Sequence, residues 1–251
     1  MEHPLARSDK FYWHRYLSFY EQELTGLECA AVLEFGIWQG ASIRWLLSRY
    51  PAAKIFGADI LPVQQSWPQS ANVEYFTVDQ GDRAQLRACF NAIGGTLDLV
   101  IDDGSHIPEH QCSCLVEAVP HIRRGGIYIL EDIHTSHPSH PYYRKSKRPF
   151  RPLLGALQTL LAIDHLKRTF ESAVRVDEKL EDLTHGSPLN SAEVALLFDS
   201  IESVNIYRRT DLPDRCWSCG SADFDYGRLR CKCGQRLYAE ADSMTALIRI
   251  R

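Results

Sequence analysis

The sequence predicts an α/β fold built on a doubly wound parallel sheet, and three observations predict it. Short apolar runs alternate with amphipathic stretches between residues 30 and 130, as strands and helices do when they follow one another in turn. Several of the runs are apolar throughout, which is typical of buried parallel strands. Two of them end abruptly in carboxylates, at the place where open α/β sheets bind their ligands.

The bulk properties limit the partners and the location. With 251 residues the chain is long enough for one α/β domain and a small appendage. The net charge of -4 and the pI of about 6.2 give no reason to expect binding to nucleic acid or to an acidic membrane. No apolar stretch reaches the roughly 20 residues of a membrane helix, and residues 1–10 lack an apolar signal core. We therefore expect a cytoplasmic protein.

The main body contains the alternating elements in chain order. The aromatic, amphipathic segment 11–24 predicts an N-terminal helix. Five strands are predicted after it, over residues 30–35, 55–60, 73–78, 97–101 and 126–130. Helices are predicted between them, over residues 42–50, 83–92 and 108–121.

The amino-acid composition changes after residue 134. Residues 135–152 are rich in Pro, Ser, His and basic side chains, which predicts a long loop that serves as a lid or recognises a substrate. His134, His137 and His140 leave two interpretations open, a second metal site or a polar loop facing substrate. A helix is predicted over 153–170, the polar segment 172–189 is ambiguous, and closing strands, expected to be antiparallel, are predicted over 194–198 and 203–207. Residues 208–215 read as a linker, and 216–251 as a small separate unit.

Acidic residues follow two neighbouring predicted strands. Asp103 follows one strand, and Glu131 and Asp132 follow the next, with His106 close by in sequence. The carboxyl ends of parallel strands share one crevice, so these side chains are expected to meet. Hard oxygen ligands without a thiolate suit a divalent cation such as Mg²⁺, and an imidazole beside them suits a general base.

A glycine-containing turn follows the first strand and predicts part of a second site, one that binds an organic ligand. Gly36 and Gly40 let the backbone approach a ligand there, and Ser42 opens the helix after the turn. The spacing is not G-x-G-x-x-G, which disfavours a dinucleotide pyrophosphate. Glu34 at the end of the strand also argues against phosphate and favours an amino-acid or sulfonium group.

Polar residues at the ends of the next strands extend this site. Asp59 is placed to accept hydrogen bonds from ribose hydroxyls, and Asp79 and Gln80 to meet an adenine edge. Asp102 is expected beside the same ligand or in a structural role. The alternative is that these are ordinary strand-to-helix turns, and that Asp102 and Asp103 cap the helix that follows them.

These patterns resemble class I S-adenosylmethionine (SAM)-dependent methyltransferases, and within them the metal-dependent macrolide sugar O-methyltransferases of the mycinamicin and macrocin type. The resemblance covers roughly residues 8–210. The residues that carry it are, in chain order, Ser8-Asp9-Lys10, Trp13-His14-Arg15-Tyr16, Glu34-Phe35-Gly36-Ile37, Asp79-Gln80, Asp102-Asp103-Gly104-Ser105-His106, Gly125-Gly126-Ile127-Tyr128, Glu131-Asp132 and Phe198-Asp199-Ser200-Ile201.

The resemblance implies a Rossmann-like methyltransferase domain over residues 1–210, with 1–28 as its N-terminal helical segment. It implies SAM as cosubstrate, Mg²⁺ held by Asp103, Glu131 and Asp132, and His106 as the base that takes a proton from a hydroxyl of a sugar-bearing acceptor. Relatives of this type are often multimeric, so a homo-oligomer is consistent with it. Two alternatives stay open: a catechol-like or other vicinal-diol O-methyltransferase, and a non-catalytic methyltransferase fold that docks a partner.

Four cysteines near the C-terminus predict a separate metal site. Cys216 and Cys219 form a Cys-x2-Cys pair, and Cys231 and Cys233 a Cys-x-Cys pair, each followed by glycine. Four thiolates within so short a segment suit a structural Zn²⁺, which supplies folding energy that so small a unit lacks. We therefore expect residues 211–251 to be a zinc-ribbon-like appendage, with free or disulfide-linked thiols as the alternative.

Overall fold

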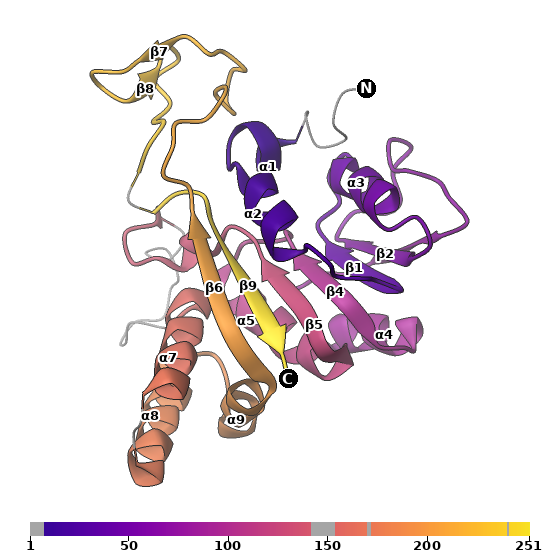
Figure 1. Ribbon diagram of the computed structural model, residues 1–251, viewed down its shortest axis with the longest axis vertical. Helices are drawn as coiled ribbons and strands as arrows, with labels where there is room; N and C mark the ends of the chain where they lie inside the picture. The colour runs from indigo at the N-terminus through magenta and orange to yellow at the C-terminus, as the bar shows by residue number, and fades with distance from the viewer. Residues whose placement is uncertain (1–7, 142–153, 170–171, 240) are drawn as a thin grey trace.

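The computed structural model describes residues 8–141, 154–169, 172–239 and 241–251. It contains a seven-stranded sheet in the order β3-β2-β1-β4-β5-β9-β6, covered by helices on both faces (Figure 1). β1 to β5 pair in parallel, whereas β9 is antiparallel to both of its neighbours. From β1 the chain adds β2 and β3 on one side, and then returns to add β4 and β5 on the other side of β1. In open α/β sheets the ligand site lies at such a switch point, here at the carboxyl ends of β1 and β4.

The predicted strands and helices of the first half are confirmed to within a few residues. The strands are β1 Ala31–Phe35, β2 Lys54–Asp59, β3 Val73–Thr77, β4 Leu97–Asp102 and β5 Ile122–Leu130. The helices between them are α3 Ala41–Arg49, α4 Arg83–Ile93 and α5 Pro108–Ala118, which a 3-10 turn, η1 Val119–His121, extends.

The core lies on both faces of the sheet because the central strands are apolar on both sides. Phe90 of α4 and Leu115 of α5 pack on one face, together with later helices. Tyr20 from the N-terminal segment and Leu46 of α3 pack on the other. This two-sided burial explains why the central strands read as continuous apolar runs.

The predicted N-terminal helix over 11–24 is wrong in one respect, since two helices replace it. α1 Asp9–Tyr12 and α2 Tyr16–Glu23 are separated at Arg15, which has a left-handed backbone with φ 58°. The break turns α1 away from the axis of α2. In Figure 1 α1 lies beyond α2, on the side of the sheet where β4 and β5 end.

The strand predicted over 194–198 is also wrong, because the segment is helical. α9 Ser191–Ser200 begins at a capping box, in which Asn190 Oδ1 accepts from the N–H of Glu193 and Glu193 Oε2 accepts from the N–H of Asn190. Within its apolar run Val194 and Leu197, three residues apart on one helix face, are buried, whereas Ala195 is exposed. The ambiguous segment before it forms α8 Ala173–Gly186, and the predicted helix over 153–170 is observed as α7 Ala156–Arg168.

The C-terminal unit does not form a separate domain up to the end of the chain. The chain leaves the sheet after β6 Ile201–Arg208, forms a small hairpin of β7 Phe224–Asp225 and β8 Arg230–Cys231, and returns as β9 Met244–Ile250. β9 lies between β5 and β6 in the main sheet. The predicted boundary at 211–251 is therefore corrected: the appendage is an excursion between two strands, because β9, mostly buried, pairs with β5 and β6 in the main sheet.

The predicted loop over 135–152 lies only partly within the described residues. It opens with a 3-10 turn, η2 Ile133–Ser136, which is buried. Residues 142–152 lie outside the described part. Among the described helices, none is long and apolar enough to cross a membrane.

The capping box at the start of α9 yields a test of the corrected secondary structure. Asn190→Ala removes the acceptor for the Glu193 N–H and is expected to lower the free energy of unfolding by about 1 kcal/mol. Chemical denaturation of the full chain measures this change. Glu178→Ala, at an exposed site within α8, serves as the matched surface control and should change stability by less than about 0.5 kcal/mol. Equal stability of both variants would contradict the assigned helix start.

Candidate active site and four-cysteine cluster

A cavity of about 1090 Å³ opens at the carboxyl ends of the parallel strands. Its wall includes the segments that follow each of the first five strands, and also residues 8–10, 12 and 14 from the N-terminal segment. The predicted site residues on its wall are Gly36, Ser42, Asp59, Asp79, Gln80, Asp103, His106, Glu131 and Asp132. Glu34, Gly40 and Asp102, which were also predicted to bind the cosubstrate, lie behind this wall.

Gly36 sits where the ends of β1 and β4 come closest. Its backbone has φ +83°, and a Cβ atom built on it would lie 2.0 Å from the carbonyl oxygen of Asp103. The N–H of Asp103 donates to the carbonyl of Phe35 at 2.9 Å, so the two strand ends are tied together at this point. Only glycine fits here, and the turn exposes its backbone to the cavity.

Glu34 is fully buried on β1 and forms an ion pair with a lysine from α1. Its Oε1 lies 3.2 Å from Nζ of Lys10. Its Oε2 makes no hydrogen bond within the described part of the chain, so one buried acceptor stays available behind Gly36. Burial raises the pKa of Glu34 while the Lys10 ammonium lowers it, and burial prevails. Gly40 nearby has φ +74° and is the N-cap residue directly before α3.

Two aspartates at the strand ends are held by backbone amides. Asp59 Oδ2 accepts from the N–H of Ile37 at 2.8 Å, and its Oδ1 accepts from the N–H of Leu61 at 2.9 Å. Asp79 Oδ1 accepts from the N–H of Gly81 at 2.8 Å. These bonds orient both carboxylates on the cavity wall, where a ligand hydroxyl or amine can meet their remaining acceptor positions.

Asp102 has a structural position rather than a place on the cavity wall. It is 3 % exposed, and both of its oxygens are occupied: Oδ1 accepts from Gln80 Nε2 and Oδ2 from the Tyr128 hydroxyl, each at 2.7 Å. Gln80 in turn accepts from the N–H of Ser105 at 2.7 Å. The prediction that Asp102 binds the cosubstrate is therefore corrected to its structural alternative, since its hydrogen bonds fasten β4 to its neighbours.

Asp103, His106 and Asp132 bring three possible metal ligands together. One ligand atom from each lies within 4.8 Å of the other two. His106 Nε2 is 3.9 Å from Asp103 Oδ1 and 3.9 Å from Asp132 Oδ2. Burial lowers the pKa of His106, but the nearby carboxylates of Asp132 and Asp103 outweigh it and raise that pKa above its ordinary value.

Asp132 is surrounded by donors from the N-terminal segment and from η2. The Tyr16 hydroxyl donates to its Oδ1 at 3.0 Å, and Nδ1 of His14 and of His134 lie 3.7 Å and 3.8 Å from the same oxygen. Burial raises the pKa of Asp132, but the three surrounding histidines and the Tyr16 hydroxyl hold it below its usual value. Asp132 is therefore held in its ionised form, in contrast to Glu131 beside it, whose pKa is raised.

Glu131 is placed differently from Asp132, its neighbour in sequence. Its side chain is buried, and its Oε1 lies 2.5 Å from Nζ of Lys10. Burial and the repulsion of Asp103 raise the pKa of Glu131. Burial would lower the pKa of Lys10, but the three carboxylates around it raise that pKa well above its ordinary value. Glu131 thus faces an ammonium group in addition to the cavity.

The residues that sequence reasoning missed come from the N-terminal segment. Lys10, His14 and Tyr16 reach the site although they are more than ninety residues from the acids they contact at Asp103 and Asp132. The aromatic pattern of residues 11–24 predicted a helix there but gave these side chains no role in the site. A lysine followed by a histidine and a tyrosine within the resembling segment is the signal that points to them.

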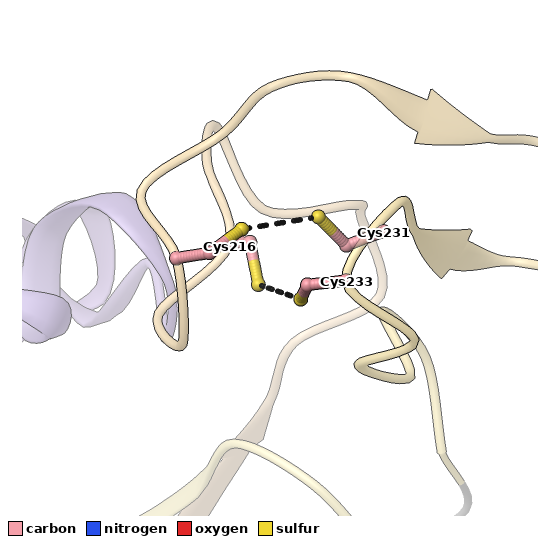
Figure 2. Close-up of side chains that lie close together, drawn as sticks. Cys216, Cys231 and Cys233 are labelled. Carbon is pink, nitrogen blue, oxygen red and sulfur yellow. Dashed lines mark hydrogen bonds between the residues drawn. The ribbon is translucent and has the colours of Figure 1, made fainter.

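The four predicted zinc ligands form a compact cluster. Cys216 Sγ lies 3.7 Å from Cys233 Sγ, and Cys219 Sγ lies 3.5 Å from Cys231 Sγ. All four sulfurs lie within 4.8 Å of one another, and Figure 2 shows the labelled side chains turned toward one another from two loops. A tetrahedron with Zn–S bonds of about 2.3 Å has edges of about 3.8 Å, so the spacing suits the metal.

One thiol of the cluster is already disposed to ionise. A hydrogen bond from the backbone N–H of Gln235 and the neighbouring thiols lower the pKa of Cys233 to about 7. The thiolate is the form that binds metal. The remaining cysteines, at 29, 89, 112 and 114, are free thiols outside the cluster, as expected for a reduced chain.

Residues 33–133 match a family model described as a methyltransferase domain. Similar proteins include the 8-demethyl-8-alpha-L-rhamnosyl tetracenomycin-C 2'-O-methyltransferase of Streptomyces olivaceus, 34% identical over 139 residues, which are 52% of this chain and 36% of that protein. The mycinamicin VI 2''-O-methyltransferase of Micromonospora griseorubida is 33% identical over 143 residues, 53% of this chain and 35% of that protein. The resemblance to sugar O-methyltransferases is thereby confirmed, over little more than a third of these relatives' length.

A solved structure shares the fold over nearly the whole chain. The MycE methyltransferase from the mycinamycin biosynthetic pathway, in complex with Mg, SAH and mycinamycin VI, aligns with a TM-score of 0.63 and 20% identity. The alignment covers 98% of this chain and 53% of that one. It confirms the Rossmann-like methyltransferase fold that the resemblance implied.

The close approach at Gly36 yields a test of the site's geometry. Gly36→Ala places a Cβ against the Asp103 carbonyl, and the positive φ alone costs about 1–2 kcal/mol. We expect a lower melting temperature and a displaced end of β4. Gly95→Ala, with nothing within 4 Å of its new Cβ, is the matched control and should melt like the parent protein. A Gly36→Ala variant as stable as the control would contradict the contact.

Proposed function

We propose that this chain, whose residues 33–133 match a methyltransferase domain, is a SAM- and Mg²⁺-dependent O-methyltransferase that methylates a hydroxyl of a sugar-bearing small molecule. One observation carries the proposal: Asp103, His106 and Asp132 gather hard ligand atoms on the wall of the same cavity that the Gly36 turn lines. The names of the relatives, which methylate rhamnosyl tetracenomycin and mycinamicin, support the acceptor class.

The cosubstrate half of the cavity is assigned to the ends of the first three strands. Gly36 and Ser42 offer a close backbone approach, and the amide-held carboxylate of Asp59 suits the ribose hydroxyls of SAM. Asp79 and Gln80 are assigned to the adenine edge. Glu34, whose buried Oε2 has no hydrogen-bond partner within the described residues, is assigned to the positively charged amino-acid group.

The cation half is assigned to Asp103 and Asp132, with Glu131 as the third predicted ligand. Carboxylate oxygens are the ligands that suit Mg²⁺ or a similar divalent ion, so His106 is left to act on the acceptor. Such a cation, when bound, orients adjacent hydroxyls of the acceptor and lowers the pKa of one of them. His106 stands beside both aspartates, so it is within reach of the same hydroxyl.

His106 is proposed as the general base. Its Nε2 accepts the proton of the acceptor hydroxyl, and the carboxylates that face this ring stabilise the imidazolium that results. The hydroxyl oxygen then takes the methyl group from the sulfonium, which leaves as the neutral thioether of S-adenosylhomocysteine. The cavity walls contribute by holding the oxygen and the methyl carbon in line.

The four-cysteine cluster is proposed to hold a structural Zn²⁺. Four thiolates leave no open coordination position, so the metal there serves the fold of residues 216–233 and not the chemistry. The two-residue strands β7 and β8 offer little core of their own. Metal binding then supplies the folding energy of this unit.

The proposed reaction is tested by transfer of labelled methyl from SAM to a panel of glycosylated acceptors that includes aryl α-L-rhamnosides. We expect turnover that EDTA abolishes and added Mg²⁺ restores, because the cation lowers the pKa of the acceptor hydroxyl. Undiminished turnover in EDTA would remove the cation from the proposal. Failure of SAM to bind in isothermal titration would refute the enzyme assignment.

Two histidine variants refine the same assay. His106→Ala is expected to bind SAM normally and to lose about 10²–10⁴-fold in turnover, the usual contribution of a general base. His185→Ala, on the exposed surface of α8, is the matched control and should keep full turnover. A His106→Ala variant as active as the control would show that another group takes the proton.

The zinc proposal is tested by elemental analysis of protein purified under reducing conditions without chelators. About one zinc per chain is expected, and the double variant Cys216→Ser and Cys219→Ser should lose it. Cys29→Ser alters a thiol outside the cluster and should retain the metal. A reduced parent protein without zinc would contradict the assignment.

A further inference from the structure

Asp132 presents its two carboxylate oxygens to different groups. Its Oδ1 accepts from the Tyr16 hydroxyl at 3.0 Å, with Nδ1 of His14 at 3.7 Å and Nδ1 of His134 at 3.8 Å. Its Oδ2 is instead 3.9 Å from Nε2 of His106. One oxygen is therefore held by the N-terminal segment and η2, while the other is directed toward the proposed base.

The backbone of Asp132 shows that its surroundings impose this placement. Asp132 has φ 49°, in the left-handed region that residues other than glycine rarely adopt. Such a conformation persists only where the surrounding structure fixes it. The Tyr16 hydroxyl contributes to fixing it, since it donates to the side chain of this same residue.

Tyr16 itself has little freedom to move. It is fully buried, and its ring stacks on that of His14, with the centroids 4.9 Å and the planes 17° apart. The ring of Tyr207 from β6 packs edge-on against it, with centroids 5.9 Å apart. Turning the Tyr16 ring would break both contacts, so its hydroxyl is offered to Asp132 in one direction.

The segment around Tyr16 is too short to hold itself in place. α1 has four residues and α2 has eight, and isolated helices of such lengths are unstable in water. The two helices are separated at Arg15, whose side chain forms an ion pair with Asp214. The N–H of Asp214 also donates to the carbonyl of Tyr12 at 2.8 Å. Contacts with the start of the appendage thus fix the break directly before Tyr16.

Trp13 seats the same segment on the four-cysteine unit. It is 4 % exposed and packs in one apolar cluster with Cys216, Cys231 and Leu237. Its ring lies 6.4 Å from that of Trp217, edge to face. In Figure 2 a helix in the colour of the N-terminus lies beside Cys216. The fold of the cysteine cluster therefore decides where Trp13, and with it the next residues, can lie.

A buried arginine joins this seat to His14. Arg209 is 3 % exposed, and its guanidinium donates to the Leu237 carbonyl at 2.9 Å and to Ser243 Oγ at 3.2 Å. The same guanidinium lies 5.0 Å from the ring centroid of Trp13. Ser243 Oγ is also 2.9 Å from Nδ1 of His14. Arg209, Leu237 and Ser243, the neck of the appendage, thus hold Trp13 and His14 in place.

We propose that Tyr16 is a positioning residue, which holds Oδ1 of Asp132 so that Oδ2 faces the cation, and that the four-cysteine unit keeps Tyr16 there through Trp13 and the neck. The inference rests on the proposed cation-dependent reaction and keeps Asp103, Glu131 and Asp132 as the ligands. A carboxylate ligand that accepts a hydrogen bond on its other oxygen stays oriented for its metal. The four-cysteine unit thereby supports the cation site, although none of its four sulfurs, all in the described part of the chain, lies on the cavity wall.

The first test is Tyr16→Phe, which removes the hydroxyl and keeps the ring. Free Mn²⁺ is measured by electron paramagnetic resonance during titration of the full chain, with no acceptor present. Oxygen-rich sites suit Mn²⁺ and thiolate sites do not, so the four-cysteine cluster does not interfere. We expect about tenfold weaker Mn²⁺ binding, the usual loss when a group that orients a metal ligand is removed.

Further measurements separate the orientation of Asp132 from a general structural defect. The SAM affinity of Tyr16→Phe, from isothermal titration, should equal that of the parent protein. The Mg²⁺ concentration for half-maximal methyl transfer should rise about tenfold, whereas the rate at saturating Mg²⁺ should recover toward that of the parent. Tyr50→Phe is the matched control, because the buried Tyr50 hydroxyl accepts from Arg49 Nε at 3.2 Å, away from the cavity wall, and its Mn²⁺ affinity should not change.

A second pair of variants tests the seat of the segment. Trp13→Ala is expected to weaken Mn²⁺ binding in the same direction, and adding Tyr16→Phe should weaken it little further, because both act through one hydroxyl. Leu183→Ala is the control: it removes a buried side chain of α8 and should lower the melting temperature without altering Mn²⁺ binding. Should Trp13→Ala fail to fold, Ser243→Ala removes only the neck hydroxyl and is expected to shift the affinity the same way.

The outcomes are distinguishable from those of the proposed function. Unchanged or tighter Mn²⁺ binding in Tyr16→Phe, beside a parent protein that binds the ion, overturns the role of Tyr16 and leaves the reaction intact. Unchanged affinity in Trp13→Ala, or additive losses in the double variant, overturns the part assigned to the four-cysteine unit. A parent protein that does not bind Mn²⁺ removes the cation site itself. Weaker binding in Tyr16→Phe with no methyl transfer by the parent would support Tyr16 and refute the reaction.

Discussion

The backbone pairing of β1, β4 and β5 is the constraint on which the rest of the structure depends. The N–H of Asp103 donates to the carbonyl of Phe35, and the N–H of Glu131 donates to the carbonyl of Asp102, each at 2.9 Å. These bonds continue the parallel ladders past the last strand residues. Carboxylates that would repel one another in solution are therefore held together at one edge of the sheet, and the molecule must compensate their charge.

The compensation comes from segments outside the sheet. Lys10 from α1 pairs with Glu34 and Glu131, and Tyr16 and His14 contact Asp132. The appendage between β6 and β9 holds α1 in turn through Trp13. The N-terminal segment thus packs between the acids that the central strands present and the appendage, and the proposed reaction uses the carboxylate oxygens that face the cavity.

Most of the strands and helices of the first half were predictable, because their signals are local. Apolar runs, the cap at Asp82 and the proline at the start of α5 each act within a few residues. The errors arose where a local pattern suits two structures. The apolar run of α9 is compatible with a strand or a helix, and the capping box at Asn190 is the local signal that favours a helix. The aromatic pattern before residue 24 is continuous and gives no sign of the break at Arg15.

The sequence by itself determined the chemistry at the strand ends: the carboxylates, the histidine after Asp103, the glycine turn at residue 36 and the four thiols. Their identity and their order along a parallel sheet suffice, since strand ends of that kind converge. Only the tertiary structure decided which acids line the cavity and which of them also pair with an ammonium group. In the folded chain Asp102 is buried and accepts a hydrogen bond from Tyr128, and Lys10 contacts Glu131, which is 121 residues away in sequence. Such contacts could not be predicted, because long-range packing leaves no periodic pattern in the sequence.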